Sequence, residues 1–232
     1  MKRLPEAYRA VVLGASGAIG SALVAALQAD ARCAQVLAYS RSSDPGFDLE
    51  DEATMAACAE HAASHGPLHV VLDATGALHI DGHGPEKRLG ALDPLRLARA
   101  FAVNAIGPTL LLKHFVPLLA TDAPAVFATL SARVGSIEDN RTGGWYGYRA
   151  SKAALNMLLQ TAAIEAARTR PLAVFAALQP GTVASKLSGP FVAPVDALTP
   201  AASAAGMLAA LDALQPTGRA QFVDYRGETI PW

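Results

Sequence analysis

The sequence predicts one α/β domain, built on a doubly wound parallel sheet with helices on both faces. The chain has 232 residues, of which 52% are hydrophobic and 17% charged, and a chain of this kind can bury a large core. Short apolar runs alternate with helical patterns of ten or more residues, which favours right-handed strand–helix–strand units. No linker composition interrupts this alternation, so we expect a single domain over residues 1–232.

The first half of the chain contains three apolar runs, each followed by a helical pattern. The first run ends at Gly14, and apolar residues spaced three and four apart begin near Gly17. Turn-forming residues follow the second run and precede an Ala-rich helix. In chain order, we expect strands at 10–13, 35–39 and 68–72, and helices from residue 17, at 51–65 and at 95–119.

The second half continues the same alternation to the end of the chain. We expect strands at 125–130, 172–178 and 221–225, and helices at 148–167 and 200–214. Three irregular segments rich in Gly, Pro or polar residues follow predicted strands, at 76–93, 135–144 and 181–199. In an open α/β sheet the ligand binds outside the carboxyl ends of the strands, so these loops are expected to form the site.

The charge and cysteine content exclude several classes of function. A formal net charge of −1 without a basic run gives no electrostatic footprint for nucleic acid or an anionic membrane. Cys33 and Cys58 are too few for a disulfide scaffold, which suits a reducing, cytoplasmic setting. We find no targeting or membrane-spanning segment. The paired histidines of residues 61–65 and 79–83 lack a third ligand, so no metal is expected.

A glycine cluster between the first strand and the first helix is placed where a Rossmann-type dinucleotide-binding loop belongs. Glycines permit the tight turn and let the backbone approach a pyrophosphate, whose charge the helix N-terminus stabilises. Such turns also occur for packing alone, and the position after a strand favours the binding function. The expected cofactor contacts here are Gly14, Ser16, Gly17, Ile19 and Gly20.

The end of the second strand indicates NADP rather than NAD. An acid at this point would bind the ribose hydroxyls and repel a 2′-phosphate. The sequence instead has Ser40 and Arg41 followed by two more serines, and a guanidinium suits a phosphate. The alternative is that Arg41 is an ordinary solvated turn residue.

Tyr148 and Lys152 lie four residues apart at the start of a predicted helix, on one face. A free phenol has a pKa of about 10, and an adjacent ammonium and a cationic cofactor ring would lower it. Tyr148 is therefore a candidate to exchange a proton with a substrate oxygen. Tyr146 has no lysine four residues on, and we interpret it as pocket lining.

Taken together, the glycine loop, the Tyr148/Lys152 pair and the later Pro180-Gly181 resemble the short-chain dehydrogenase/reductase family in order and approximate spacing. The resemblance covers nearly the whole chain. Finer features at 131–137, 144–149 and 230–232 look like the bacterial C-factor-like branch, which includes proteins discussed as developmental signals.

The resemblance implies roles for four catalytic residues. Tyr148 would be the acid/base, and Lys152 would bind the nicotinamide ribose and lower the phenol pKa. Asn104 matches the asparagine that supports a proton relay. Ser131 looks like the serine that orients the substrate carbonyl, although the family often places it at the position of Ala132, so Ser136 or no serine remains an alternative.

The resemblance also implies further cofactor contacts. Pro180, Gly181 and Val183 would contact the nicotinamide carboxamide, with Ser185 where a threonine is common, and Asp48 would bond the adenine amino group. Two departures stand out: Ala18 replaces a family glycine, and Asp73 begins a turn that is usually Asn-Ala-Gly. In that turn the expected cofactor contacts are Ala74, Thr75 and Gly76.

Two functional hypotheses follow. The first is an NADP-dependent oxidoreductase that interconverts a small-molecule carbonyl and a secondary alcohol by hydride transfer. The alternative is a dinucleotide-binding signalling or sensor protein with little or no turnover. The family also implies a homodimer or homotetramer, formed through the helices at 95–119 and 148–167. The sequence contains no code for the substrate.

Overall fold

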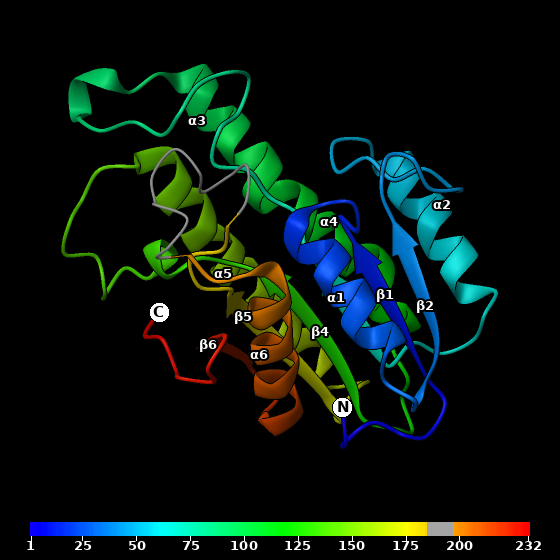
Figure 1. Ribbon diagram of the computed structural model, residues 1–232. Coiled ribbons are helices and arrows are strands. Elements are labelled where there is room, and N and C mark those ends of the chain that lie inside the picture. The colour runs from blue at the N-terminus through cyan, green and yellow to red at the C-terminus, as the bar shows by residue number, and fades with distance from the viewer. Residues whose placement is uncertain (185–196) are drawn as a thin grey trace.

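The computed structural model describes residues 1–184 and 197–232 and has three layers, with a parallel sheet between two layers of helices (Figure 1). Six strands lie in the order β2-β1-β3-β4-β5-β6, and every neighbouring pair is parallel. This confirms the predicted fold class. The strands are β1 (Tyr8–Leu13), β2 (Cys33–Tyr39), β3 (Val70–Asp73), β4 (Ala125–Leu130), β5 (Ala173–Gln179) and β6 (Ala220–Asp224).

The helices divide between the two faces of the sheet. Val11 and Leu13 pack with one helical layer, and their neighbours Ala10 and Val12 pack with the other, because successive strand residues point to opposite faces. The first layer holds α2 (Glu52–Ala63), α4 (Gly107–Phe115) and α5 (Tyr146–Ala166); the second holds α1 (Ala18–Gln28) and α6 (Pro200–Ala213).

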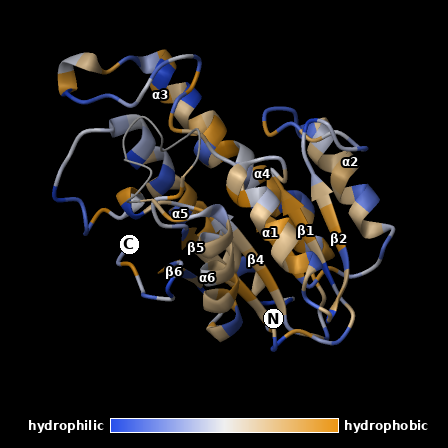
Figure 2. Cartoon of the chain, in the orientation of Figure 1, coloured by the Kyte–Doolittle hydropathy of each residue, from blue (hydrophilic) through white to orange (hydrophobic). Residues whose placement is uncertain are grey.

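The central strands are buried on both sides. Every residue of β3 and β4 is buried, including Phe127 in the middle of β4. Strands covered on both faces have near-continuous apolar sequences, and the hydrophobic colours of Figure 2 concentrate on the strands and the inner sides of the helices. Burial of both faces explains why continuous apolar runs, rather than alternating ones, marked the strands.

Local hydrogen bonds fix where several helices begin. The Asp51 carboxylate accepts from Ala53 N, and the Asp93 carboxylate accepts from Arg96 N at the start of α3 (Pro94–Phe101). Thr199 caps α6 in the same way. These side chains satisfy backbone N–H groups that have no partner inside the helix.

The helix expected at 95–119 is continuous but irregular. It runs over Pro94–Leu118, and a π-helical turn, η2 (Ala102–Ile106), separates α3 from α4. Pro108 has no N–H for the carbonyl of Asn104 four residues earlier, which disfavours regular α-helical bonding at this point. Among the described residues this helix alone is long and apolar enough to cross a membrane, and it instead supplies Leu111, Phe115 and their neighbours to the core.

The chain reverses its winding at β1, which lies between β2 and β3. Such a switch point opens a crevice at the carboxyl ends of the strands. The loop of residues 74–93, with the short helix η1 (Leu89–Ala91), and α3 extend from this edge, as Figure 1 shows. The loops at this edge are therefore placed to form a binding site.

Candidate active site

A cleft of about 600 Å³ lies at the carboxyl edge of the sheet, between the N-terminus of α1 and the ends of β4 and β5. Its described lining contains two cations, Arg133 and Lys152, and no carboxylate. Such a cleft is suited to an anionic ligand. The predicted site residues among its lining are Ser16, Gly17, Ile19, Ala74, Thr75, Gly76, Ser131, Tyr148, Lys152, Pro180, Gly181 and Val183.

The glycine loop has a shape that side chains would prevent. Gly14 has a φ of +78°, and a Cβ there would lie 3.0 Å from the carbonyl oxygen of Ala74. A Cβ on Gly20 would lie 2.2 Å from the carbonyl oxygen of Gly14, which real structures do not permit. The loop therefore brings the start of α1 against the end of β1, and the helix N-terminus faces the cleft.

The end of β2 is tied to the glycine loop. The carbonyl of Tyr39 accepts hydrogen bonds from Gly14 N and Ala15 N, both at 3.0 Å. Ser40 begins a turn held by serine hydroxyls, and Arg41 projects from it into solvent. Within the described part of the chain, no acid pairs with the Arg41 guanidinium. Arg41 thus lies beside the loop, beyond the cleft lining, with its charge available.

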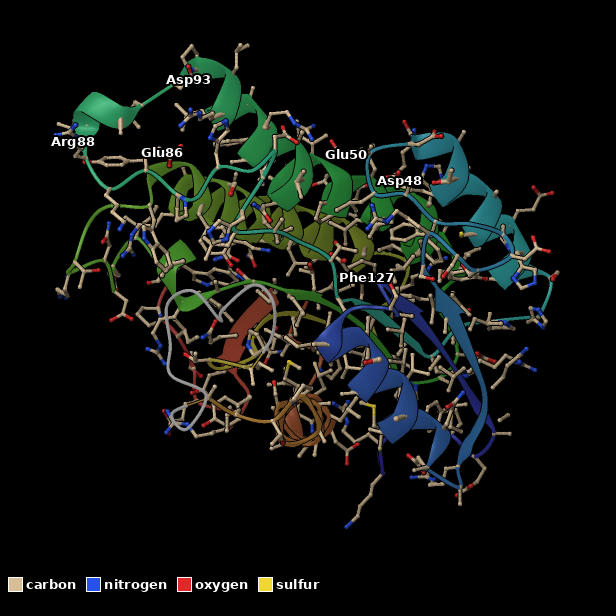
Figure 3. The ribbon with its side chains drawn as sticks, turned by 45° about the horizontal axis from the view of Figure 1, so that its top comes forward. Asp48, Glu50, Glu86, Arg88, Asp93 and Phe127 are labelled. Carbon is tan, nitrogen blue, oxygen red and sulfur yellow. The ribbon has the colours of Figure 1, made fainter. Side chains whose placement is uncertain are left out.

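Asp48 lies farther along the same edge. Its backbone and one carboxylate oxygen shape the local turn, because Asp48 N donates to Thr54 Oγ1 and Glu50 N donates to Asp48 Oδ1. Figure 3 shows Asp48 and Glu50 near the start of α2. The side chain is exposed and does not belong to the described lining of the cleft.

The turn after β3 is organised by Asp73, a buried carboxylate. Its Oδ1 accepts from the backbone and hydroxyl of Thr75, and its Oδ2 accepts from Thr129 Oγ1 at 2.6 Å. The acid thus caps the turn that presents Gly76. A Cβ on Gly76 would lie 3.1 Å from both Asn104 Oδ1 and Lys152 Nζ, so the turn fits closely against these two side chains.

Asn104 sits in the π-helical turn and is fully buried. Its side chain pairs with the backbone of Ala77 in both directions: Oδ1 accepts from Ala77 N at 2.9 Å, and Nδ2 donates to Ala77 O at 2.8 Å. The side chain is therefore held by the backbone of Ala77 and links the π-helical turn to the loop after β3. Local π-helical turns are frequent at functional sites.

Tyr148 lies in the first turn of α5, after three consecutive residues with positive φ, Gly143, Gly144 and Trp145. The buried Glu86 anchors this start: its Oε2 accepts from Gly147 N at 3.0 Å, and its carbonyl accepts from Trp145 N. Figure 3 shows Glu86 on the loop before α3. A carboxylate at a helix N-terminus is stabilising, so the position of Tyr148 depends on a loop distant in sequence.

Burial raises the pKa of Tyr148 to about 12. This direction is opposite to the lowering expected from the neighbouring lysine, because desolvation disfavours the phenolate. The protonated phenol is therefore the stable form near neutral pH.

Lys152 is the most deeply buried charge of the cleft, with 3% of its surface exposed. Its Nζ donates to the carbonyl of Leu130 at 2.7 Å. Burial lowers the pKa of Lys152 to about 8, and the negative charge of Asp73 opposes that shift. Lys152 therefore stays protonated at neutral pH, although burial makes its charged form less stable than it is in water.

The structure separates the two candidate serines. Ser131 follows β4 directly and lines the cleft, and its hydroxyl donates to Asn156 Oδ1 at 2.7 Å. Ser136 accepts from Asp139 N, lies near the carbonyl of Trp232 and is absent from the cleft lining. Ser131 is therefore the serine whose position suits substrate contact.

The segment after β5 closes the other side of the cleft. Gly181 has a φ of +78°, and a Cβ there would lie 2.6 Å from Leu198 and 2.9 Å from the Tyr225 ring. Val183 pairs with Leu198 in an isolated bridge and is buried. The segment that contains Pro180, Gly181 and Val183 is thus fixed by its neighbours, whereas Ser185 lies outside the described residues.

Several cleft residues are not found by the sequence analysis. Trp145 lines the cleft and packs edge-on against Tyr148, with ring centroids 6.3 Å apart. Tyr146 is absent from the described lining of this cleft. An aromatic residue three positions before Tyr148 gives only a weak signal in a sequence. Other lining residues found only from the fold are Leu78, Ala132, Arg133, Val134, Gln179 and Thr182.

The comparisons with known proteins assign the chain to a class. The family model for short chain dehydrogenases matches residues 8–195. The chain therefore belongs to the short-chain dehydrogenase family of oxidoreductases, which agrees with its Rossmann-type fold and its cleft.

Two relatives indicate the branch of the family to which the chain belongs. The C-signal protein of Myxococcus xanthus is 36% identical over 169 residues, covering 72% of this chain and 94% of the relative. The 1-hydroxy-2-glutathionyl-2-methyl-3-butene dehydrogenase of Rhodococcus sp. (strain AD45) is 30% identical over 200 residues, covering 86% and 84%. Within the family, the chain is a member of the C-factor-like branch.

A solved structure shows the same fold. The NADPH-bound carbonyl reductase from chicken fatty liver superposes with a TM-score of 0.85 at 22% identity, over 98% of this chain and 95% of that one. The similarity extends over the whole architecture described above.

Proposed function

We propose that the protein is an NADP-dependent oxidoreductase that interconverts a small-molecule carbonyl and a secondary alcohol. One observation carries the proposal: Tyr148, Lys152 and Ser131 line the same cleft that the glycine loop enters. A proton donor, a cation and a hydroxyl beside a dinucleotide-binding loop form a set suited to carbonyl reduction.

The residues fit a nicotinamide dinucleotide. Side chains at Gly14 or Gly20 would fill the turn through which the backbone approaches a pyrophosphate. The cleft of about 600 Å³ has no described carboxylate in its lining, which favours an anionic ligand. When bound, NADPH supplies the hydride that the side chains of this chain cannot supply.

The roles of the catalytic side chains follow from their surroundings. In reduction, Tyr148 donates a proton to the substrate oxygen as negative charge grows there, so its hydrogen bond strengthens in the transition state. The Lys152 ammonium stabilises the phenolate that remains. The carbonyl of Asn104, which Pro108 cannot satisfy, offers an acceptor through which water resupplies the proton.

NADP is the proposed form of the cofactor because Arg41 lies beside the glycine loop with no acidic partner in the described chain. A guanidinium there stabilises a 2′-phosphate through charge-assisted bonds. The carbonyl reductase compared above was solved with NADPH bound, which supports the same choice.

The expected oligomer and cytoplasmic setting form part of this proposal. Ile106, Met157 and Ile164 expose 54%, 66% and 46% of their surfaces on η2 and α5, and apolar surface of this kind favours self-association. The signalling hypothesis is not favoured, because a sensor would need the lysine contact to the cofactor but not the tyrosine beside it.

The test is NADPH consumption, followed by absorbance, across a panel of aldehydes, simple ketones and keto acids. We expect turnover of at least one carbonyl class, with NADPH preferred over NADH. Saturable NADPH binding without turnover of any compound would favour the sensor hypothesis instead.

A further inference from the structure

The stripe of α5 that carries Tyr148 and Lys152 continues with a third polar residue. Asn156 lies four residues after Lys152, so all three side chains share one face of the helix. Asn156 is 3% exposed and lies between the buried apolar residues Leu155 and Leu159. A buried amide is costly unless it is hydrogen-bonded, so its presence in an apolar layer requires an explanation.

One described hydrogen bond satisfies the oxygen of the Asn156 amide but leaves its nitrogen without a partner. Oδ1 accepts the hydroxyl proton of Ser131 at 2.7 Å, and both residues are buried. The other amide atom, Nδ2, is buried and has no hydrogen-bond partner among the described residues. The amide therefore keeps an unused donor next to the serine of the cleft.

The backbone of Ser131 is fixed, so its hydroxyl alone can change partners. Ser131 N donates to the carbonyl of Leu178 at 2.8 Å and continues the pairing of β4 with β5. A serine hydroxyl has one proton to donate and two lone pairs that accept. In the observed arrangement that proton is given to Asn156 and is not available to a ligand in the cleft.

From this geometry we propose that Asn156 is a positioning residue that switches the Ser131 hydroxyl between two orientations. Without a substrate oxygen, Ser131 donates to Oδ1 as observed. When Ser131 turns its proton to a substrate oxygen, the amide turns over and Nδ2 donates to Oγ, which gives the unused donor its partner. The inference rests on the proposed function, because it concerns how Ser131 serves a substrate carbonyl.

An asparagine suits this task better than the alternatives. An apolar side chain could neither accept the hydroxyl proton nor donate to the hydroxyl oxygen, and an ionised carboxylate could only accept. The amide can both accept and donate at one place without a net charge. This also explains why the position is not filled by leucine, as at 155 and 159 on the same helix.

The experiment is a double-mutant cycle of Asn156→Leu and Ser131→Ala, with kcat and NADPH affinity measured for each variant. Loss of an oxyanion donor costs about 10²–10³ in kcat, and we expect Asn156→Leu to cost about 10-fold in kcat, a part of that effect, with NADPH affinity unchanged. In the Ser131→Ala background, Asn156→Leu is expected to have almost no further effect on kcat.

Gln160→Leu is the matched control, since Gln160 is an amide one turn farther along α5 that bonds Ala220 N and not the cleft. It is expected to keep the wild-type kcat. The inference is overturned if Asn156→Leu keeps the wild-type kcat, or if it lowers kcat equally in both backgrounds, as a general packing defect would. A wild type without turnover would instead overturn the proposed function itself.

Discussion

The two halves of the carboxyl edge hold their functional groups by different means. Around β1 and β2, the backbone makes the site: Gly14 and Gly20 fit where no side chain can, and Tyr39 binds the loop through its carbonyl. Around β4 and β5, buried polar side chains make it, above all Lys152 and Ser131. Substitutions around β1 and β2 should therefore impair function by steric clashes. Substitutions around β4 and β5 should impair it by removing single chemical groups.

The largest expected effect comes from removing a chemical group near β4 and β5. Tyr148→Phe removes the proton donor and keeps the ring that packs against Trp145. We expect turnover to fall by about 10²–10⁴, the range for a general acid, with little change in thermal stability. Steady-state rates and a melting curve on the same preparation check this, and near-normal turnover would refute the role of Tyr148.

The next largest effect is expected from a steric change in the glycine loop. A methyl group on Gly20 would meet the Gly14 carbonyl at 2.2 Å, so Gly20→Ala must displace the loop. We expect NADPH affinity to fall by at least about 10-fold and unfolding free energy to drop by about 1–3 kcal/mol, as overpacking does. Gly90→Ala is the control, because nothing lies within 4 Å of its Cβ and its φ is ordinary. Equal effects of the two substitutions would contradict a steric role for Gly20.

The buried lysine predicts a pH dependence of stability. Because the pKa of Lys152 falls from 10.5 to about 8 on folding, this side chain binds more protons in the unfolded chain between these values, and its contribution to the unfolding free energy rises with pH there. Tyr148, with its raised pKa, opposes the rise above about pH 10. From pH 8 to 10 we expect Lys152 itself to contribute a gain of about 2 kcal/mol, which the buried Cys58 thiol opposes because burial raises its pKa to about 11.

Lys152→Met should remove that contribution, so chemical denaturation measured across pH should show that its unfolding free energy gains about 2 kcal/mol less than that of the wild type between pH 8 and 10. Lys113→Met is the matched control, since Lys113 is 64% exposed and pairs with Glu52 at the surface. Its curve should run parallel to that of the wild type. If Lys152→Met also ran parallel, the buried ammonium would not be the source of the effect.

The smallest expected effect is on the preference for NADPH over NADH. Arg41→Ala is expected to weaken NADPH binding by about 10-fold, the lower range for a charge-assisted hydrogen bond at an exposed site, and to leave NADH binding unchanged. Arg88→Ala, on an exposed loop residue, should alter neither. Fluorescence titrations measure both affinities, and an equal loss for NADH and NADPH would mean that Arg41 does not contact the 2′-phosphate.

The elements and site residues that depend on local sequence patterns could be predicted from the sequence. Continuous apolar runs identified β3 and β4 because both strands are buried on both faces. The glycine spacing and the Tyr148/Lys152 pair depend on contacts close in sequence, so their places in the cleft could be predicted. The long helix could be predicted as an element, but its π-helical turn at Asn104 depends on how Pro108 is accommodated by the surrounding packing.

Contacts between distant segments could not be predicted. Glu86 anchors Gly147 across 61 positions, and no local pattern connects a loop acid to a later helix. Ser131 and Ser136 both follow β4, and only the fold shows which one faces the cleft. Asn156 did leave a signal, since positions 148, 152 and 156 repeat at helical spacing, but an amide at such a position is also common in structural roles.

The central claim, that the cleft binds NADPH without the Tyr148 hydroxyl but transfers a proton only with it, is tested most directly by titrating the wild type and Tyr148→Phe with NADPH, following nicotinamide fluorescence. The account predicts saturable binding with the same affinity in both proteins, while only the wild type consumes NADPH with a carbonyl substrate. Absence of binding in the wild type, or its loss in Tyr148→Phe, would contradict the account.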